Sequence, residues 1–279
     1  MNIFQAILMG IIQGLTEFLP VSSSGHLAIF RSILNVNTDV SALFEALLHL
    51  GTLAAVFVVF WSDVKMLIIE TLKLIRDAVL WVVKKQKIEL YTERMLSLLV
   101  IVASVPTAII GLIVELFLED LLLSSLISVG IGLLITGALL LLMTKIPQSN
   151  KQLKDMKLRD GVFIGLIQGI ATIPGISRSG STVTAGLFCG LEKDFAYRFS
   201  FLISIPAILG ATLLELLQIS AADASNFGLY LVGMVIAGVI GYFSLIWMRQ
   251  LLQKWKFHYF GFYDLAVGLI VLIIGIFTA

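Results

Sequence analysis

Two short polar stretches interrupt apolar parts of this sequence and contain most of the side chains that could do chemistry. Residues 13–26 read Gln-Gly-Leu-Thr-Glu-Phe-Leu-Pro-Val-Ser-Ser-Ser-Gly-His, and residues 174–182 read Pro-Gly-Ile-Ser-Arg-Ser-Gly-Ser-Thr. Together they supply a carboxylate, an imidazole, a guanidinium and several hydroxyls. This set suits phosphoryl chemistry, because a guanidinium fork fits phosphate oxygens and an activated hydroxyl can attack phosphorus.

Arg178 is the most specific residue of the second stretch. An arginine in an apolar segment is costly at membrane depth and usually has a function. Backbone N–H groups and hydroxyls at the start of a helix can converge on the same anion. We predict that Arg178 binds phosphate oxygens; a structural ion pair with Glu17 is the alternative. Substrate contacts in this stretch are expected from Gly175, Ser177, Ser179 and Thr182.

The first stretch offers three candidate reactive groups, Glu17, Ser23 and His26. Glu17 could accept a proton or hold a divalent cation, or serve only in an ion pair with Arg178. Ser23 is a candidate nucleophile activated by either neighbour, with substrate positioning as its alternative role. His26 titrates in the range that suits proton transfer, although it could be a hydrogen-bonded interior residue. Further substrate contacts are expected from Gln13, Ser22 and Ser24.

Glu45 and His49 form a second acidic–imidazole pair in the apolar segment that follows. They stand four residues apart and therefore share one face of a helix. The pair could extend the site, or it could satisfy itself inside the protein. We rank it behind the two polar stretches.

The elements that carry these residues are predicted to be membrane helices. Of the 279 residues, 59% are hydrophobic and 13% are charged, whereas soluble domains carry about 25% charged residues. A net charge of +1 gives no basic surface for nucleic acid, and one cysteine excludes a Cys-rich metal site. The apolar stretches long enough to span a bilayer are 41–60, 95–116, 121–143, 197–217, 228–248 and 260–277.

The orientation of these spans follows from the Lys and Arg residues between them. Three connections, 63–94, 145–159 and 249–258, are rich in Lys and Arg and belong in the cytoplasm. The remaining connections lack such residues and belong outside. Residues 66–83 are apolar but carry interspersed charges, which predicts an amphipathic helix on the cytoplasmic face.

The two segments that carry the polar stretches do not fit this alternation as full spans. Ile3–Leu34 and Gly161–Leu191 each must begin and end on one side of the membrane. We therefore predict two re-entrant helical hairpins, the first entering from outside and the second from the cytoplasm. Their polar turns should meet near the middle of the bilayer.

The two hairpin segments are also related in sequence. A shift of 155 positions brings identical residues together at Gly10/Gly165, Ile12/Ile167, Gln13/Gln168, Gly14/Gly169, Ser22/Ser177, Ser24/Ser179 and Gly25/Gly180. Because the copies enter from opposite sides, the repeat has inverted topology. The predicted fold is an all-α integral membrane protein, one polytopic domain over residues 1–279, with six transmembrane helices and two re-entrant hairpins. Its repeats cover about residues 1–143 and 157–279.

At these residues the chain resembles the bacterial undecaprenyl-pyrophosphate phosphatase family that is linked to bacitracin resistance. Residues 13–26 are similar to the family's (Glu/Gln)-x-x-x-Glu region with its Ser and His, and residues 174–182 to its Pro-Gly-x-Ser-Arg-Ser-x-x-Thr motif. Phe44-Glu45 and residues 199–201 extend the resemblance over nearly the whole chain. Gln13 stands where many members have a second Glu, which weakens a two-carboxylate metal site.

The resemblance implies conversion of undecaprenyl pyrophosphate to undecaprenyl phosphate and inorganic phosphate, in recycling of the carrier for cell-wall synthesis. It implies a multi-pass protein of the bacterial plasma membrane with its active site facing out. By position, the functional residues are Glu17, Ser23, His26, Ser177, Arg178 and Thr182. Dependence on Mg²⁺ or Ca²⁺, with Glu17 as a ligand, follows from the same resemblance. We expect no organic cofactor and no nucleic acid, with membrane lipids as partners and a homodimer left open.

Three other functions compete with this one. A polyprenyl-phosphate transporter or flippase is the main alternative, because inverted repeats are typical of alternating access. The other class of membrane lipid phosphatases needs a Lys-x6-Arg-Pro motif and a later Ser-Arg-x5-His-x3-Asp motif, and the sequence contains neither. A bacitracin-binding regulatory protein would give no reason for an Arg-and-Glu site between two hairpins.

Overall fold

A computed structural model of the chain describes residues 1–33, 42–85, 91–118, 125–217, 221–254 and 256–278. In this part every regular element is a helix, apart from one isolated bridge between Lys151 and Leu191. The helices are α1 Ile3–Thr16, α2 Ser23–Ile33, α3 Ala42–Val59, α4 Trp61–Lys84, α5 Thr92–Leu118, α6 Leu126–Met143, η2 Leu153–Asp155, α7 Leu158–Ile170, α8 Arg178–Phe188, α9 Lys193–Leu216, α10 Ala221–Gln253 and α11 His258–Thr278.

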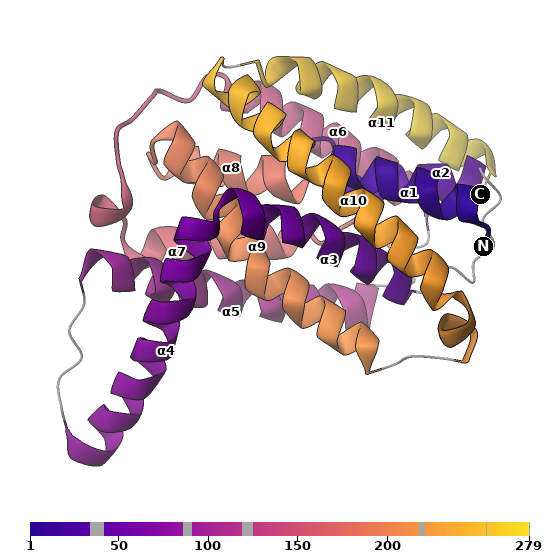
Figure 1. Ribbon diagram of the computed structural model, residues 1–279. Coiled ribbons are helices and arrows are strands. Elements are labelled where there is room, and N and C mark those ends of the chain that lie inside the picture. Colours follow the sequence, from indigo (N-terminus) through magenta and orange to yellow (C-terminus); the bar gives the residue numbers. More distant parts are fainter. Residues whose placement is uncertain (34–41, 86–90, 119–124, 218–220, 255, 279) are drawn as a thin grey trace.

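Six helices of the described residues are long and apolar enough to cross a membrane. They are α3, α5, α6, α9, α10 and α11. These confirm the six expected spans, although Ser41 and residues 121–124 of the predicted ranges lie outside the described residues. The long α4 also confirms a helix over residues 66–83; it extends away from the bundle in Figure 1.

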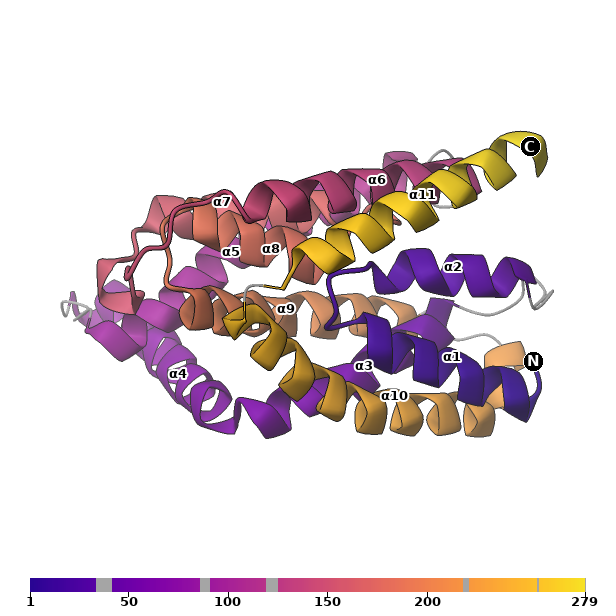
Figure 2. The same cartoon turned by 90° about the horizontal axis from the view of Figure 1, so that it is seen from above.

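Two pairs of shorter helices, α1–α2 and α7–α8, occupy the segments where re-entrant hairpins are expected. Helices α1 and α2 lie side by side and run from a common turn toward the end of the bundle that holds both termini (Figure 2). Helices α7 and α8 lie in the other half of the bundle in the same view. The tips of the two pairs therefore point toward each other. The last residue of the predicted first hairpin, Leu34, lies outside the described residues.

Each helix pair is held by close backbone contact with a long helix. Helix α1 packs against α10, and a Cβ added to Gly10 would lie 2.6 Å from the Gly233 carbonyl oxygen. Helix α7 packs against α5, and a Cβ on Gly165 would lie 2.1 Å from the Ala103 carbonyl oxygen. In lipid, small residues at such contacts allow the close van der Waals packing that holds helices together. The aligned glycines of the two segments thus perform the same packing role.

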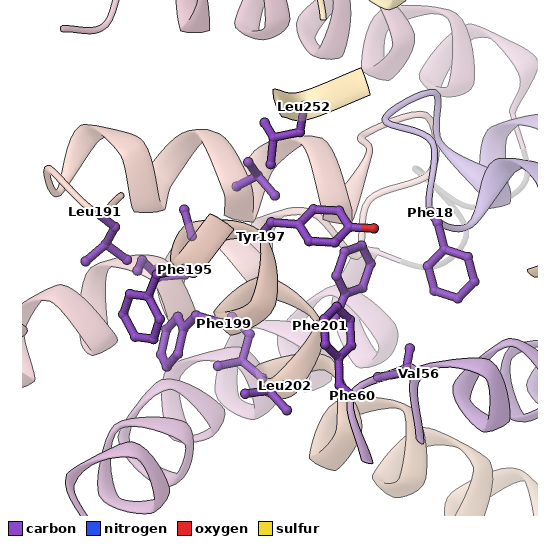
Figure 3. Close-up of a cluster of buried hydrophobic side chains, with 14 of the residues drawn as sticks. Phe18, Val56, Phe60, Leu191, Phe195, Tyr197, Phe199, Phe201, Leu202 and Leu252 are labelled. Atoms are coloured by element: carbon purple, nitrogen blue, oxygen red, sulfur yellow. The ribbon is translucent and has the colours of Figure 1, made fainter. Parts of the chain in front are cut away.

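An aromatic cluster fixes the first turn against the core. The ring of Phe18, which follows Glu17, meets Phe201 of α9 edge-on, with the ring centroids 5.4 Å apart (Figure 3). Phe201 also contacts Tyr197 at 4.7 Å and stacks on Phe60 at 6.2 Å. Such aromatic pairs add to the stabilisation that burial alone gives. The backbone beside Glu17 is therefore tied to a rigid part of the bundle.

The contact between α7 and α5 leads to a stability prediction. Gly165→Ala should destabilise the protein by about 1–3 kcal/mol, because the new methyl group would meet backbone that cannot move aside. Gly210→Ala is the matched control, since no heavy atom lies within 4 Å of its added Cβ and alanine favours a helix by about 1 kcal/mol over glycine. Thermal unfolding in detergent measures both. Equal midpoints for the two variants would contradict the packing role.

Candidate active site

The turns of the two short helix pairs touch each other, as the sequence predicts. A Cβ added to Gly25 would lie 3.2 Å from the Cα of Gly175, and one on Gly180 would lie 3.1 Å from Cβ of Pro20. The hydroxyl of Ser179 donates to the Leu19 carbonyl oxygen at 3.4 Å. The polar side chains of both turns are thereby brought into one place.

The second helix of each pair begins with the same serine-to-backbone hydrogen bond. The Ser22 hydroxyl oxygen accepts the Gly25 N–H at 3.2 Å before α2, and the Ser177 hydroxyl oxygen accepts the Gly180 N–H at 3.1 Å before α8. Serine is a preferred capping residue at such positions. The first residues of α2 and α8 are Ser23 and Arg178. Both therefore project from helix N-termini, where the helix dipole favours an anion.

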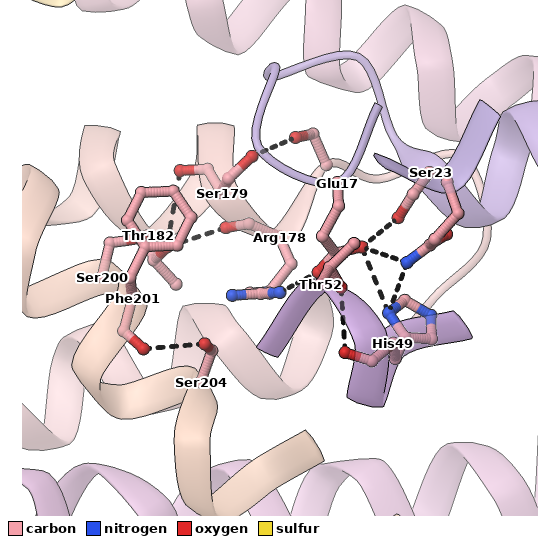
Figure 4. Close-up of polar contacts among 12 residues, drawn as sticks. Glu17, Ser23, His49, Thr52, Arg178, Ser179, Thr182, Ser200, Phe201 and Ser204 are labelled. Atoms are coloured by element: carbon pink, nitrogen blue, oxygen red, sulfur yellow. Dashed lines mark hydrogen bonds and ion pairs between the residues drawn. The ribbon is translucent and has the colours of Figure 1, made fainter. Parts of the chain in front are cut away.

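Glu17 is the centre of the polar network (Figure 4). One carboxylate oxygen, Oε1, pairs with the Arg178 guanidinium. The other, Oε2, accepts the Ser23 hydroxyl at 2.7 Å and the Gln13 side-chain amide at 2.9 Å, and it lies 3.1 Å from His49 Nδ1. Glu17 is 5% exposed, and a buried carboxylate needs such partners. The Glu17 carboxylate thus contacts both Ser23, the candidate nucleophile, and Arg178, the residue expected to bind phosphate.

A pocket of about 220 Å³ opens beside this network. It is far larger than the ~15 Å³ that a single water needs. Glu17, Ser23, His49 and Arg178 line it together with Ser24 and Ser177. The Nη1 atom of Arg178 is buried and has no hydrogen-bond partner in the described part of the chain. A buried guanidinium nitrogen without a partner is costly, so this donor suits an incoming anion.

His26 does not take part in this network. Its Nδ1 bonds the Ser22 carbonyl oxygen at 2.9 Å, and its Nε2 bonds the Tyr263 hydroxyl of α11 at 2.7 Å. Its ring stacks on the Tyr263 ring, with centroids 5.7 Å apart. His26 has the contacts of a hydrogen-bonded interior histidine, and its role in proton transfer stays a prediction. The Ser23 hydroxyl bonds Glu17, which is one of the two neighbours expected to activate it.

Several other predicted contacts position the turns rather than face the pocket. The hydroxyl of Thr182 donates to the Arg178 carbonyl oxygen and bonds the Ser200 hydroxyl of α9. Gly175 has a φ of +86°, and a Cβ there would lie 2.3 Å from the Val129 carbonyl oxygen, so the turn requires glycine. These residues hold Arg178 in place by holding its backbone.

Glu45 and His49, one turn apart on α3, have different partners in the structure. Glu45 forms an ion pair with Arg31 of α2. His49 turns to the pocket and contacts Gln13 and Glu17. The alternative in which Glu45 and His49 satisfy each other does not hold, because each residue has a partner elsewhere in the chain. The pair with Arg31 ties α2 to α3.

Three polar residues of the site, Thr136, Gln168 and Thr107, were not predicted as site residues. Thr136 of α6 accepts the Ser177 N–H at 2.9 Å and contacts the Gly175 carbonyl oxygen at 3.0 Å, which anchors the second turn. Gln168 and Thr107 line the pocket and bond each other at 3.2 Å. Gln168 could have been found as the repeat partner of Gln13. A single threonine in an apolar helix shows nothing of its partners.

The described residues do not form a ready-made metal site. No group of three or more His, Cys, Asp or Glu side chains in that part of the chain is placed to hold a metal ion. Among the residues that the structure describes, Glu17 is the one carboxylate that lines the pocket, and both its oxygens already have partners. Mg²⁺ is usually bound by one or two carboxylates together with the phosphates of a substrate. The protein side chains alone supply less than such a site needs.

Comparison with known proteins shows the family. The family described as "Bacitracin resistance protein BacA" matches residues 6–270. A protein of Halothermothrix orenii named undecaprenyl-diphosphatase is 42% identical over 285 residues, covering 99% of this chain and 100% of that protein. Proteins of the same name from Alkaliphilus metalliredigens and Methanosphaera stadtmanae are 44% identical over 285 residues and 36% over 277 residues, covering 99% of this chain in each case and 100% and 99% of the relatives. With six apolar helices of spanning length, the chain is a multi-pass membrane protein, and it belongs to the bacitracin resistance protein BacA family.

Proposed function

We propose that the protein hydrolyses undecaprenyl pyrophosphate to undecaprenyl phosphate and inorganic phosphate, in recycling of the carrier for cell-wall synthesis and in bacitracin resistance. The single observation that carries this proposal is the Ser23–Glu17–Arg178 arrangement in the pocket. It combines a hydroxyl nucleophile, an acceptor for its proton and a free guanidinium nitrogen for phosphoryl oxygens. The names of the relatives support the same reaction, and no comparison favours the transporter alternative.

The chemical steps follow from these contacts. The Ser23 hydroxyl oxygen attacks the terminal phosphorus while its proton passes to Glu17 Oε2. The bond from that phosphorus to the bridging oxygen breaks, and undecaprenyl phosphate leaves. Water then attacks the phosphoserine, gives inorganic phosphate and restores the Ser23 hydroxyl. Arg178 and the N-termini of α2 and α8 stabilise the charge that develops on the phosphoryl oxygens.

We place the pocket nearer the outer face of the membrane. Ala46 and Thr212 line it, and they lie near the start of α3 and near the end of α9. Both helix ends are external when the Lys-rich and Arg-rich connections lie in the cytoplasm. The re-entrant insertion of the two helix pairs belongs to the same proposal. It is supported by the opposite ends of the bundle from which the pairs approach in Figure 2.

If the reaction uses Mg²⁺ or Ca²⁺, the pyrophosphate of the substrate would supply most of the oxygen ligands in this proposal. The shortage of carboxylates around the pocket supports this over a resident ion. A chelator would then lower phosphate release without unfolding the protein. A chelator-induced loss of thermal stability in the absence of substrate would instead indicate a resident metal.

The lipid tail has a separate place beside the pocket. An apolar groove of about 890 Å³ runs between α3 and α10 and includes Leu209 of α9. Leu50 and Leu209, which line the groove, follow His49 and Ile208, which line the pocket. The groove therefore begins on α3 and α9 at residues next to those that line the site for the pyrophosphate. We assign it to the first isoprene units of the substrate, whose chain needs an apolar path from the headgroup.

The function is tested by phosphate release from undecaprenyl pyrophosphate by the purified protein in detergent. Arg178→Lys should lower kcat/KM by about 10²–10³-fold, because lysine keeps the charge but loses the fork that serves Glu17 and phosphate together. Arg198→Lys is the matched control, since Arg198 pairs with Asp63 away from the pocket. Absence of phosphate release by the wild-type protein, or a fully active Arg178→Lys variant, would refute the proposal.

The groove is tested by substrates of different chain length. Ala54→Trp should raise KM for undecaprenyl pyrophosphate by about tenfold, because the indole would fill space that the tail occupies. The rate with a short polyprenyl pyrophosphate such as farnesyl pyrophosphate should change much less. Ala138→Trp, on the exposed side of α6, is the control. An equal loss with both substrates would show that the tail lies elsewhere.

A further inference from the structure

His49 stands in direct contact with the carboxylate that binds the nucleophile. Its Nδ1 lies 3.1 Å from Glu17 Oε2, the oxygen that also accepts the Ser23 hydroxyl. The Gln13 side-chain amide lies 2.9 Å from the same nitrogen and 2.9 Å from the same oxygen. A triangle of contacts therefore fixes the imidazole against Glu17 (Figure 4).

The two ring nitrogens of His49 have different surroundings. All its hydrogen bonds recorded within the described residues involve Nδ1. The side chain is 29% exposed and lines the pocket, so the rest of the ring faces the space that substrate would fill. When Nδ1 is the unprotonated ring nitrogen, Gln13 can donate one amide hydrogen to Glu17 and the other to Nδ1. In that tautomer the basic nitrogen of the imidazole lies beside Glu17, within reach of a proton that arrives at Oε2.

The charged groups around His49 come from four parts of the chain. Glu17 lies on the turn after α1, Arg178 begins α8, and Glu45 is one turn earlier on α3, where it pairs with Arg31 of α2. The helices α9 and α10 also pack on α3. The pocket-lining residues of α9 carry no titratable group, and residues 224–248 of α10 contain no Asp, Glu, Lys, Arg or His. Glu17 is accordingly the nearest acidic partner of the ring.

The position of His49 provides a final acceptor for the proton of the Ser23 hydroxyl. The ordinary pKa of a glutamate is about 4.3, far below that of a hydroxyl, whereas an ordinary imidazole titrates at about 6.5. A carboxylate paired with a guanidinium is also most stable when it stays charged. A proton that reaches Oε2 of Glu17 therefore has a better acceptor 3.1 Å away.

We propose that His49 acts through Glu17 as the proton-accepting and positioning partner of the Ser23 hydroxyl. The inference rests on the proposed function. As the bond from Ser23 Oγ to phosphorus forms, the Ser23 proton moves to Glu17 Oε2 and from there to His49 Nδ1. When water attacks the phosphoserine, its proton passes to the Ser23 oxygen as the phosphate leaves, and His49 releases its proton to solvent. Each proton is accounted for, and Glu17 is a carboxylate again as soon as the proton has reached His49.

The other repeat offers a comparison for this role. The shift of 155 positions pairs His49 with Ser204, which also lines the pocket. The Ser204 hydroxyl donates to the Phe201 carbonyl oxygen at 2.8 Å and so satisfies its own helix. At these two related positions beside the pocket, His49 has a titratable side chain that contacts Glu17, whereas Ser204 does not.

The test is the pH profile of kcat/KM for phosphate release by the full-length protein. The wild-type protein should lose activity as the pH falls through the imidazole range, because a protonated His49 cannot accept a further proton. His49→Gln should lower kcat by about 10–100-fold with less than a twofold change in KM, and the acid limb should disappear. The amide of glutamine can still bond Glu17, so a purely structural role would be preserved.

His258→Gln is the matched control, because His258 starts α11 and does not line the pocket. It should keep both the rate and the acid limb. Should His49→Gln not give monodisperse protein, His49→Asn replaces it. A wild-type profile without an acid limb, or an unchanged limb in the His49 variant, overturns the inference. Lack of phosphate release by the wild-type protein would be a different result, which refutes the proposed function itself.

Discussion

The ion pair between Glu17 and Arg178 is the interaction on which the rest of the site depends. Either charge alone would be strongly unfavourable in the apolar interior of a membrane protein, so each requires the other. The two residues come from separate helix pairs, so the pair exists only while the two turns touch at Gly25, Gly175 and Pro20. The contact between Phe18 and Phe201 fixes the first turn, and Thr136 fixes the second. Much of the surrounding structure thus serves to hold two opposite charges at one point.

The positions related by the 155-residue shift share their place at the start of a helix and differ in chemistry. Ser23 and Arg178 are the first residues of α2 and α8, each preceded by a capping serine. Glu17 corresponds to Thr172, and both line the pocket. In the proposed mechanism the first segment thus supplies the nucleophile and the proton acceptor, and the second supplies the cation. A site between two similar halves can bind an anion from both sides, yet only unlike side chains can attack one phosphorus and stabilise its oxygens.

Sequence reasoning recovered the large features because they follow from local composition. The six spans appear as apolar runs of sufficient length, and the two turns appear as serine-rich and glycine-rich breaks between shorter ones. The glycines that allow α1 and α7 to pack closely appeared as identities between the segments, although their partners on α10 and α5 did not. Arg178 and Glu17 were recognised for the same local reason, since a charged residue in an apolar segment is rare.

The sequence by itself determined the class of protein, the two polar turns and the chemical groups available to them. Only the tertiary structure decided which histidine contacts Glu17. His26 lies in the polar stretch, yet its ring turns to Tyr263, while His49 comes from a distant helix and reaches Glu17. The physical reason is that the direction of a side chain from a helix is fixed by rotation and packing against neighbours far away in sequence. Composition and spacing along one segment show which residues share a helix face, but not which neighbouring helix that face meets.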